Sequence, residues 1–277
     1  MQSIIPIEYK NTIPNIGDVN ITGFSRSGFR TGFVMKINGF TIYLDAGLSS
    51  SFIPDLILLT HGHLDHTSSL PAILSQNIKC PIMHPKSLSH NLLLAVKSFY
   101  CLNNDILDKK HFSINSIIKT HAQFKKGQKQ IAIETFDLDH GVSCQGYKIY
   151  VEKQKLKDEY IGKSGEELKE IKKTEEITKV VKQPSVIFCC DTSSRVLSSL
   201  DYSFPIIIIE CTFLLDEHYE EAISRLHIHW KDLEPYIYSN KTTNFCLIHF
   251  STRYKNEQLI EFEKQVQKSY SNVEFWI

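Results

Sequence analysis

The 277-residue sequence lacks several patterns that would place it in a specialised class of protein. It has no run of about 18 consecutive apolar residues, so we expect no membrane-spanning helix. Lys and Arg number 31, as do Asp and Glu, so no overall charge draws the chain to nucleic acid. Any site for a polyanion must therefore be a local patch. We also find no internal repeat and no interdomain linker, and we expect a single domain over residues 1–277.

The seven cysteines are odd in number and include no Cys-x-x-Cys pair. Several lie inside apolar runs, where a reduced cysteine packs as a small hydrophobic side chain. A disulfide framework is therefore not expected, and the sequence favours a reducing, cytoplasmic compartment. Residues 1–10 have no basic start, no long apolar run and no small-residue cleavage site, so we expect no signal peptide.

What the sequence does contain is a recurrent element, a short apolar and β-branched run that ends on an ionisable residue. Continuous runs of this kind are typical of strands buried on both faces, so other layers must cover the sheets. Five of them end on His, Asp or Glu, which indicates one polar edge where strand ends converge. The runs are residues 40–44, 56–60, 185–190, 205–209 and 245–248, followed by Asp45, His61, Asp191, Glu210 and His249.

Helical spacing of apolar residues occurs between these runs. It predicts helices over residues 68–74, 86–100, 218–226 and 257–270. Residues 152–182 differ, because Lys and Glu interleave there with few large apolar side chains. We interpret this segment as a charged helical insertion supported by i,i+4 ion pairs, with a dedicated binding arm as the alternative.

Four side chains of the kinds that bind metals stand within six residues, at His61, His63, Asp65 and His66. In a strand, residues i and i+2 point the same way, so His61 and His63 can hold one ion. If the chain then turns into a helix, Asp65 and His66 reach a second position beside the first. Imidazole with carboxylate suits Zn²⁺, with Mn²⁺ or Fe²⁺ as substitutes. The segment therefore predicts two divalent metal ions.

The segment His-x-His-x-Asp-His resembles the signature of the metallo-β-lactamase fold, and further positions agree in chain order over nearly the whole sequence. The resemblance implies an α/β fold of four αββα layers. It also implies a set of metal ligands and a residue that orients one of them. These are His61, His63 and His140 for one ion, Asp65, His66 and His249 for the other, Asp191 bridging the two, and Asp45 orienting a ligand.

Residues outside the ligands resemble ribonuclease Z, the tRNA 3′-processing endonuclease of this superfamily. Residues 140–147 are similar to its His-x-x-x-x-x-Gly-Tyr stretch, and residues 247–254 match its closing motif. Residues 210–213 resemble its Glu-Ala-Thr-Phe segment, and His227 matches the first His of its His-Ser-Thr segment. The resemblance implies a homodimer that acts on precursor tRNA.

The reaction implied is phosphodiester hydrolysis, in which a metal-bridging hydroxide attacks phosphorus. Asp65 is expected to accept the proton of the attacking water. His227, oriented by Glu210, is the candidate general acid for the departing 3′ oxygen, because the carboxylate raises the imidazole pKa toward working pH. The candidate phosphate contacts are Ser251, Arg253 and Tyr254.

Two departures leave the substrate open. The Gly-rich opening of the family is replaced by residues 23–28, and residues 152–182 lack the Gly-Pro that its tRNA-gripping arm often carries. The alternatives are a hydrolase of a smaller substrate, such as a cyclic nucleotide, a lactam or a thioester, and a non-catalytic binding protein.

Overall fold

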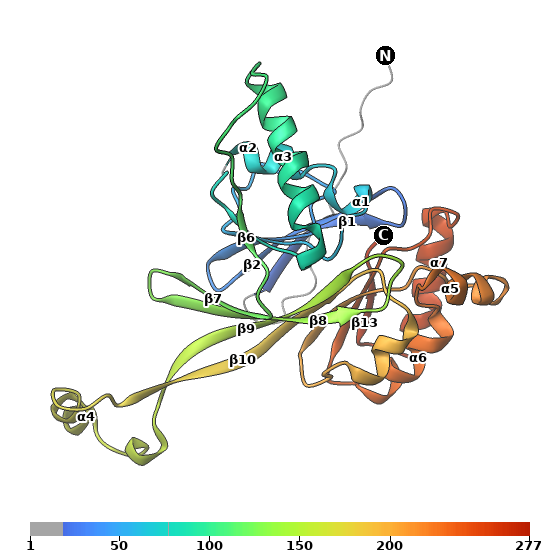
Figure 1. The fold of residues 1–277 in the computed structure, drawn as a ribbon. Helices are drawn as coiled ribbons and strands as arrows, with labels where there is room; N and C mark the ends of the chain where they lie inside the picture. Colours follow the sequence, from blue (N-terminus) through green and yellow to red (C-terminus); the bar gives the residue numbers. More distant parts are fainter. Residues whose placement is uncertain (1–18, 77) are drawn as a thin grey trace.

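The structure is a computed structural model that describes residues 19–76 and 78–277 (Figure 1). The N-terminal segment for which the sequence predicts no signal peptide lies outside this part of the chain. Among the described residues, no helix is both long and apolar enough to span a bilayer.

Six strands of the N-terminal half form the first sheet, in the spatial order β1-β2-β3-β4-β5-β6. The first three pair antiparallel through tight turns, and the remaining neighbours pair parallel. The strands are β1 (Val19–Arg26), β2 (Arg30–Ile37), β3 (Phe40–Leu44), β4 (Leu56–Leu58), β5 (Pro81–Met83) and β6 (Asn115–Ile117).

Seven strands of the C-terminal half form the second sheet, in the order β13-β12-β11-β10-β9-β8-β7. Strands β7 to β10 pair antiparallel, and β10 to β13 pair parallel. The strands are β7 (His121–Lys126), β8 (Lys129–Leu138), β9 (Cys144–Leu156), β10 (Thr178–Cys189), β11 (Ile206–Glu210), β12 (Asn244–Ile248) and β13 (Val273–Phe275).

The two sheets pack face to face over one apolar core, in which Phe33 of β2 meets Phe188 of β10 edge to face. Each fully buried side chain of this size contributes about 1.5–3 kcal/mol of transfer free energy. Separate apolar clusters join each outer face to helices. The protein is therefore the four-layered αββα sandwich that the sequence predicts (Figure 1). The first sheet is covered by α2 (Leu70–Gln76) and α3 (Ser89–Asn103), the second by α6 (Trp230–Ser239) and α7 (Asn256–Gln267).

All five apolar runs overlap a strand, and each predicted helical stretch overlaps a helix. The stretch 218–226 contains α5 (Tyr219–Arg225), and a short helix, α1 (Leu64–Thr67), precedes α2. The sequence did not predict α6, which has Pro235 in its interior. Because Pro usually interrupts a helix, its position hides the helical pattern on either side.

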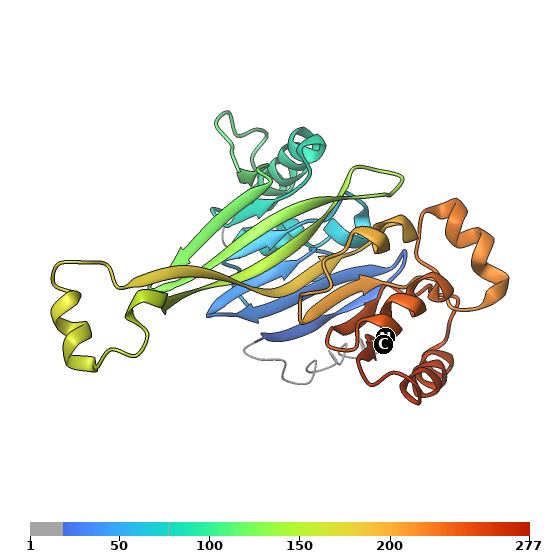
Figure 2. The same cartoon turned by 90° about the horizontal axis from the view of Figure 1, so that it is seen from below.

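Residues 152–182, which we call the arm, are not the helical insertion predicted from the sequence. Strands β9 and β10 continue as an antiparallel pair as far as Leu156 and Thr178. Only η2 (Asp158–Tyr160), a 3₁₀ helix, and α4 (Gly165–Ile171) are helical. The pair projects away from the sandwich (Figures 1 and 2). A strand pair without a buried face needs no apolar alternation, which is why the sequence carries no strand pattern here.

Candidate metal centre

Three of the predicted strand-end residues have a left-handed backbone. The φ angles are 56° at Asp45, 39° at Asp191 and 65° at His249. This region is uncommon for residues other than glycine, and residues held there cluster at functional sites. Each therefore redirects its side chain where a strand ends.

His61 and His63 do not lie on a strand, contrary to the prediction, since β4 ends at Leu58 and α1 begins at Leu64. Their rings still meet, with Nε2 of His61 2.9 Å from Nδ1 of His63. His140, in the turn between β8 and β9, has its ring centroid 5.2 Å from both. The three imidazoles thus form one group.

The carboxylate of Asp191 lies between this group and a second one. Its Oδ2 is 3.7 Å from Nε2 of both His61 and His140. Its Oδ1 is 3.4 Å from Nε2 of His66 and 3.2 Å from Nε2 of His249. One oxygen therefore faces each group, as a bridging ligand would.

Asp65 completes the second group from α1. Its Oδ2 is 3.6 Å from Nε2 of His66 and 3.8 Å from Nε2 of His249. The same oxygen accepts a hydrogen bond of 3.0 Å from the Gly28 N–H, in the turn between β1 and β2. That turn therefore helps to hold Asp65 toward the cluster.

Several ring nitrogens of this cluster are buried without a hydrogen-bond partner among the described residues. They are Nε2 of His66 and of His249 and both ring nitrogens of His140. A buried polar atom with no partner costs free energy, and a bound cation would remove that cost. The donors are imidazoles and carboxylates, which suit Zn²⁺ and related divalent ions. The residues present therefore fit a metal centre.

Charge in the cluster supports the same conclusion. Burial and the nearby His66 lower the pKa of His61 to about 2, so its imidazole is neutral, the form that binds metal. Burial acts to lower the pKa of His66 as well, but the carboxylates of Asp191 and Asp45 outweigh it and raise the value to about 9. The carboxylates thus draw positive charge into the centre of the cluster.

Asp45, the predicted orienting residue, is wholly buried beneath the cluster. Its Oδ2 accepts from Nδ1 of His66 at 2.8 Å, and its Oδ1 accepts from the Thr60 N–H at 2.7 Å. Pairing at Nδ1 leaves Nε2 of His66 directed into the cluster. Partners of this kind fix the ring orientation of metal-binding histidines.

A second pair, Glu210 and His227, adjoins the cluster. Oε1 of Glu210 accepts from Nδ1 of His227 at 2.7 Å, and the ring centroid of His227 is 5.3 Å from that of His140. Glu210 is fully buried and also accepts from the Thr212 hydroxyl at 2.6 Å. Burial acts to lower the pKa of His227, but the charge of Glu210 and this hydrogen bond raise it to about 9.

The predicted phosphate contacts already have partners within the chain. Arg253 donates two hydrogen bonds of 2.8 Å to Glu221, and its Nε donates to the Ser251 hydroxyl at 3.0 Å. The Tyr254 hydroxyl bonds to the Leu214 N–H and to a histidine, and is buried. The geometry therefore gives a phosphate role for these residues no support.

Sequence reasoning missed two residues that shape the site. A Cβ on Gly47 would lie 1.8 Å from the Asp65 carbonyl oxygen, so only glycine allows α1 to pack here. The Thr212 hydroxyl, between Glu210 and Nδ1 of His249 at 3.1 Å, links the pair to the cluster. Thr212 stands in the Glu-Cys-Thr-Phe segment, which was the available signal.

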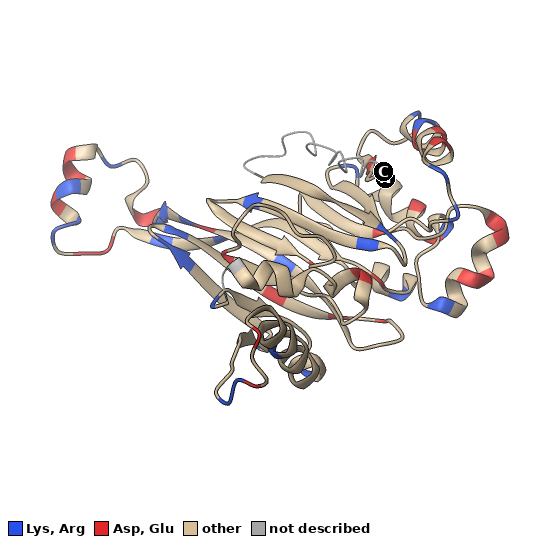
Figure 3. Ribbon diagram, turned by 90° about the horizontal axis from the view of Figure 1, so that it is seen from above, with Lys and Arg blue, Asp and Glu red and all other residues tan. Residues whose placement is uncertain are grey.

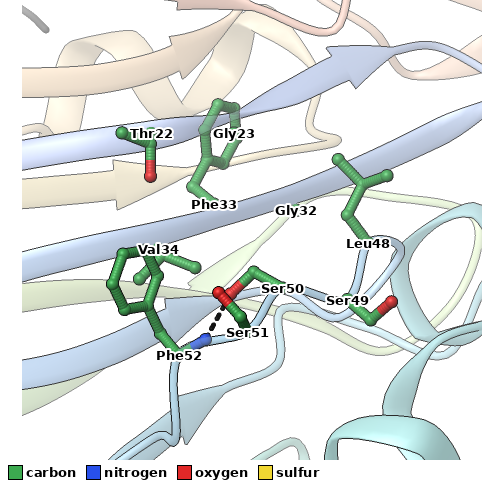
Figure 4. Close-up of a pocket in the computed structure, with 10 residues that line it drawn as sticks. All are labelled: Thr22, Gly23, Gly32, Phe33, Val34, Leu48, Ser49, Ser50, Ser51 and Phe52. Atoms are coloured by element: carbon green, nitrogen blue, oxygen red, sulfur yellow. Dashed lines mark hydrogen bonds between the residues drawn. The ribbon is translucent and has the colours of Figure 1, made fainter. Parts of the chain in front are cut away.

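A separate cavity of about 290 Å³ lies beside β1 and β2 (Figure 4). Figure 4 shows side chains such as Phe33, Leu48 and Phe52 around it, together with hydroxyls of residues 49–51. Its lining contains no acid, base, histidine or cysteine. It therefore offers no group for hydrolytic chemistry. This contrasts with the histidines and aspartates around Asp191, which we call the metal-type cluster.

Comparison with known proteins agrees with this geometry. The model of the Metallo-beta-lactamase superfamily matches residues 54–100, which include the segment from His61 to His66. The tRNase Z TRZ1 of Arabidopsis thaliana is 31% identical over 218 residues, covering 74% of this chain and 75% of that protein. The chain belongs to the ribonuclease Z family. It is accordingly a metal-dependent hydrolase.

The chain is also similar to a second ribonuclease Z and to two solved structures. The ribonuclease Z of Borrelia recurrentis (strain A1) is 27% identical over 243 residues, 78% of this chain and 76% of that protein. Among solved structures, Bacillus subtilis YhfI has a TM-score of 0.56 at 14% identity, covering 91% of this chain and 92% of that one. Human short-form tRNase Z has a TM-score of 0.54 at 13% identity, covering 91% and 93%. These two structures support the metallo-β-lactamase fold alone.

Proposed function

We propose that this ribonuclease Z family member is an endonuclease that cleaves precursor tRNA at its 3′ end. It would use two divalent metal ions, with Zn²⁺ as the preferred metal. The observation that carries the proposal is the position of Asp191, with one oxygen toward each of two histidine groups. Several relatives are named tRNase Z or ribonuclease Z, which supports RNA as the substrate. The chain itself is proposed to be one domain from which the arm extends.

The two ions would occupy the two groups that Asp191 joins. The proposed ligands are His61, His63 and His140 for one ion and Asp65, His66 and His249 for the other, with Asp191 shared. Bound ions at such a centre supply an activated water and neutralise charge on the phosphoryl oxygens.

Side chains of the protein would then accept the proton of the attacking water and donate one to the leaving oxygen. Asp65, at the edge of the second group, is proposed to accept a proton from the attacking water. His227 is the proposed general acid, because it adjoins the cluster and its pKa near 9 keeps it protonated at neutral pH. Glu210 fixes the tautomer of His227 by accepting from Nδ1, which directs Nε2 away from the pair. A smaller lactam or thioester substrate would leave this pair without a role.

The arm is the proposed contact for the body of the RNA. Lys155 and Lys179 are directly opposite each other on β9 and β10, and Lys153 lies on the same face of the pair. Like charges placed opposite each other destabilise a strand pair. Asp158 accepts from Lys179 at 2.6 Å, and a phosphate backbone would offset the charge of Lys153 and Lys155. Lys and Arg mark the strands of the arm in Figure 3, while its tip carries both signs of charge. The arm therefore supplies the local basic patch that a chain without net charge requires.

Turnover of a model diester, measured together with metal content, tests the catalytic part of the proposal. The protein, purified and then dialysed against a chelator, should lose turnover of bis(p-nitrophenyl) phosphate and regain it with added Zn²⁺ or Mn²⁺. Absence of turnover in a preparation that holds two ions per chain would overturn the hydrolytic assignment. The homodimer stays a prediction from the family resemblance, which sedimentation velocity would check.

A further inference from the structure

A cysteine precedes Asp191 at the end of β10 and reaches the metal-type cluster from inside the sandwich. Cys190 is fully buried, and its Sγ donates to Oδ1 of Asp191 at 3.1 Å. This is the same carboxylate oxygen that faces Nε2 of His66 and of His249. The thiol is therefore on the side of Asp191 that belongs to the second group.

Independent observations mark this position as a ligand site. Donor atoms of His66, Cys190, Asp191 and His249 all lie within 4.8 Å of one another. Nε2 of His66 and of His249 are both buried and have no hydrogen-bond partner among the described residues. A single cation bound by both imidazole nitrogens would give each of them a partner.

The spacing suits neighbouring donors of one ion, to which Asp65 would bind as the fifth donor. Bonds of about 2.1 Å to nitrogen or oxygen and about 2.3 Å to sulfur put neighbouring donors of a five-coordinate ion about 3.0–3.6 Å apart. The Asp191 oxygen lies 3.1 Å from Sγ of Cys190, and 3.4 and 3.2 Å from the two histidine nitrogens. The other pairs among these four donors lie within 4.8 Å of one another and would draw together on metal binding.

We propose that Cys190 is a thiolate ligand of the second metal ion, in addition to Asp65, His66, Asp191 and His249. The inference rests on the proposed metal centre and makes its two sites chemically unlike. The second site gains a soft sulfur donor, whereas the first has only imidazole and carboxylate donors. Zn²⁺, Co²⁺ and Cd²⁺ are therefore favoured over Mn²⁺ at the second site. On binding, the metal–sulfur bond replaces the S–H bond, and the proton leaves to water.

A neighbouring cysteine, Cys189, provides a matched control. Cys189 packs in the apolar cluster between the second sheet and its outer helices, on the opposite face of β10. Cys144 donates to backbone carbonyls of residues 190 and 191. Cys189→Ser therefore removes the buried thiol of the adjacent residue, the last of β10, without removing the proposed ligand.

The test is a titration of the full chain with Co²⁺, followed by absorbance. We expect the wild type and C189S to develop a thiolate-to-cobalt charge-transfer band in the near ultraviolet, and C190S to lack it. C190S should also bind its second ion at least ~10-fold more weakly. Two bound Co²⁺ ions without the band in the wild type would overturn the role of Cys190 while leaving the proposed hydrolase intact. Failure of the wild type to bind any ion would overturn both.

A second measurement needs no variant, in case C190S fails to fold. X-ray absorption at the zinc edge of the fully loaded wild type should contain a sulfur shell at about 2.3 Å. It should amount to one sulfur for every two zinc ions. A spectrum fitted by nitrogen and oxygen alone, at about 2.0–2.1 Å, would contradict the proposal.

Discussion

Nδ1 of His227 lies 2.7 Å from Oε1 of Glu210, and the Glu210 carboxylate is fully buried. The pair stands beside the metal-type cluster, since the ring of His227 is 5.5 Å from that of His249. A carboxylate in this position holds the imidazole in one orientation and one tautomer. The relationship predicts that His227 acts on the leaving group and not on the metal ions.

The variant His227→Ala should therefore keep both ions but lose protonation of the leaving oxygen. We expect hydrolysis of an RNA substrate, whose leaving 3′ oxygen is a poor leaving group, to slow by about 100-fold or more. Turnover of bis(p-nitrophenyl) phosphate should change little, because p-nitrophenolate departs without a proton. Steady-state rates on both substrates, with metal content measured in parallel, check this. Equal slowing on the two substrates would show that His227 is not the general acid.

The variant His63→Ala should abolish hydrolysis together with metal loading of the first group. His63 lies beside His61 and His140, so its removal leaves the first group with two imidazoles and the shared Asp191. Metal content by mass spectrometry should fall from two ions to one or none per chain. His90→Ala, an exposed histidine of α3, is the control and should bind two ions. A fully active, fully loaded His63→Ala would remove His63 from the ligand set.

Reversing charge on the arm should weaken RNA binding without changing the chemistry. For Lys153→Glu with Lys155→Glu, which leaves the ion pair of Lys179 with Asp158 in place, we expect a higher KM for precursor tRNA and an unchanged rate on bis(p-nitrophenyl) phosphate. The salt dependence of RNA binding should also decrease, by roughly 0.7–0.9 in log–log slope for each phosphate that the arm no longer neutralises. Lys264→Glu, exposed on α7, is the matched control. An unchanged KM and salt slope would mean that this face of the arm does not bind RNA.

Gly47→Ala should disturb the centre from outside it. The added Cβ would lie 1.8 Å from the Asp65 carbonyl oxygen and 2.5 Å from that of Thr31, so α1 must shift. We expect a loss of about 1–3 kcal/mol in unfolding free energy, as overpacking typically gives, and weaker metal binding. Gly165→Ala, where a Cβ meets nothing within 4 Å, is the control. Denaturant unfolding and metal titration of both variants measure the difference, and equal stability would contradict the packing account.

The sequence predicted those parts of the fold whose signal lies within one element. Buried parallel strands are recognisable in the sequence as apolar runs. The ionisable residues that directly follow these runs, such as Asp45 and His249, were predicted to form the polar edge. The structure brings these strand ends to one edge because parallel neighbours end together. The four αββα layers came from the family resemblance and are confirmed.

What the sequence did not predict depends on packing between elements. The arm lacks a buried face, so its charges suggested a helix, while pairing between β9 and β10 decides its conformation. His61 and His63 meet through a loop and not through strand alternation. Glycine at position 47 matters only because α1 packs against it, and Cys190 matters only because Asp191 turns its carboxylate toward the thiol.

The most direct test of the central claim is to incubate the metal-loaded protein with a precursor tRNA and map the cut. We predict cleavage just after the discriminator base, leaving a 3′-hydroxyl, abolished by chelation and by His63→Ala. A protein that holds two ions and hydrolyses a model diester, but leaves several precursor tRNAs uncut, would contradict the tRNA substrate and favour a smaller one.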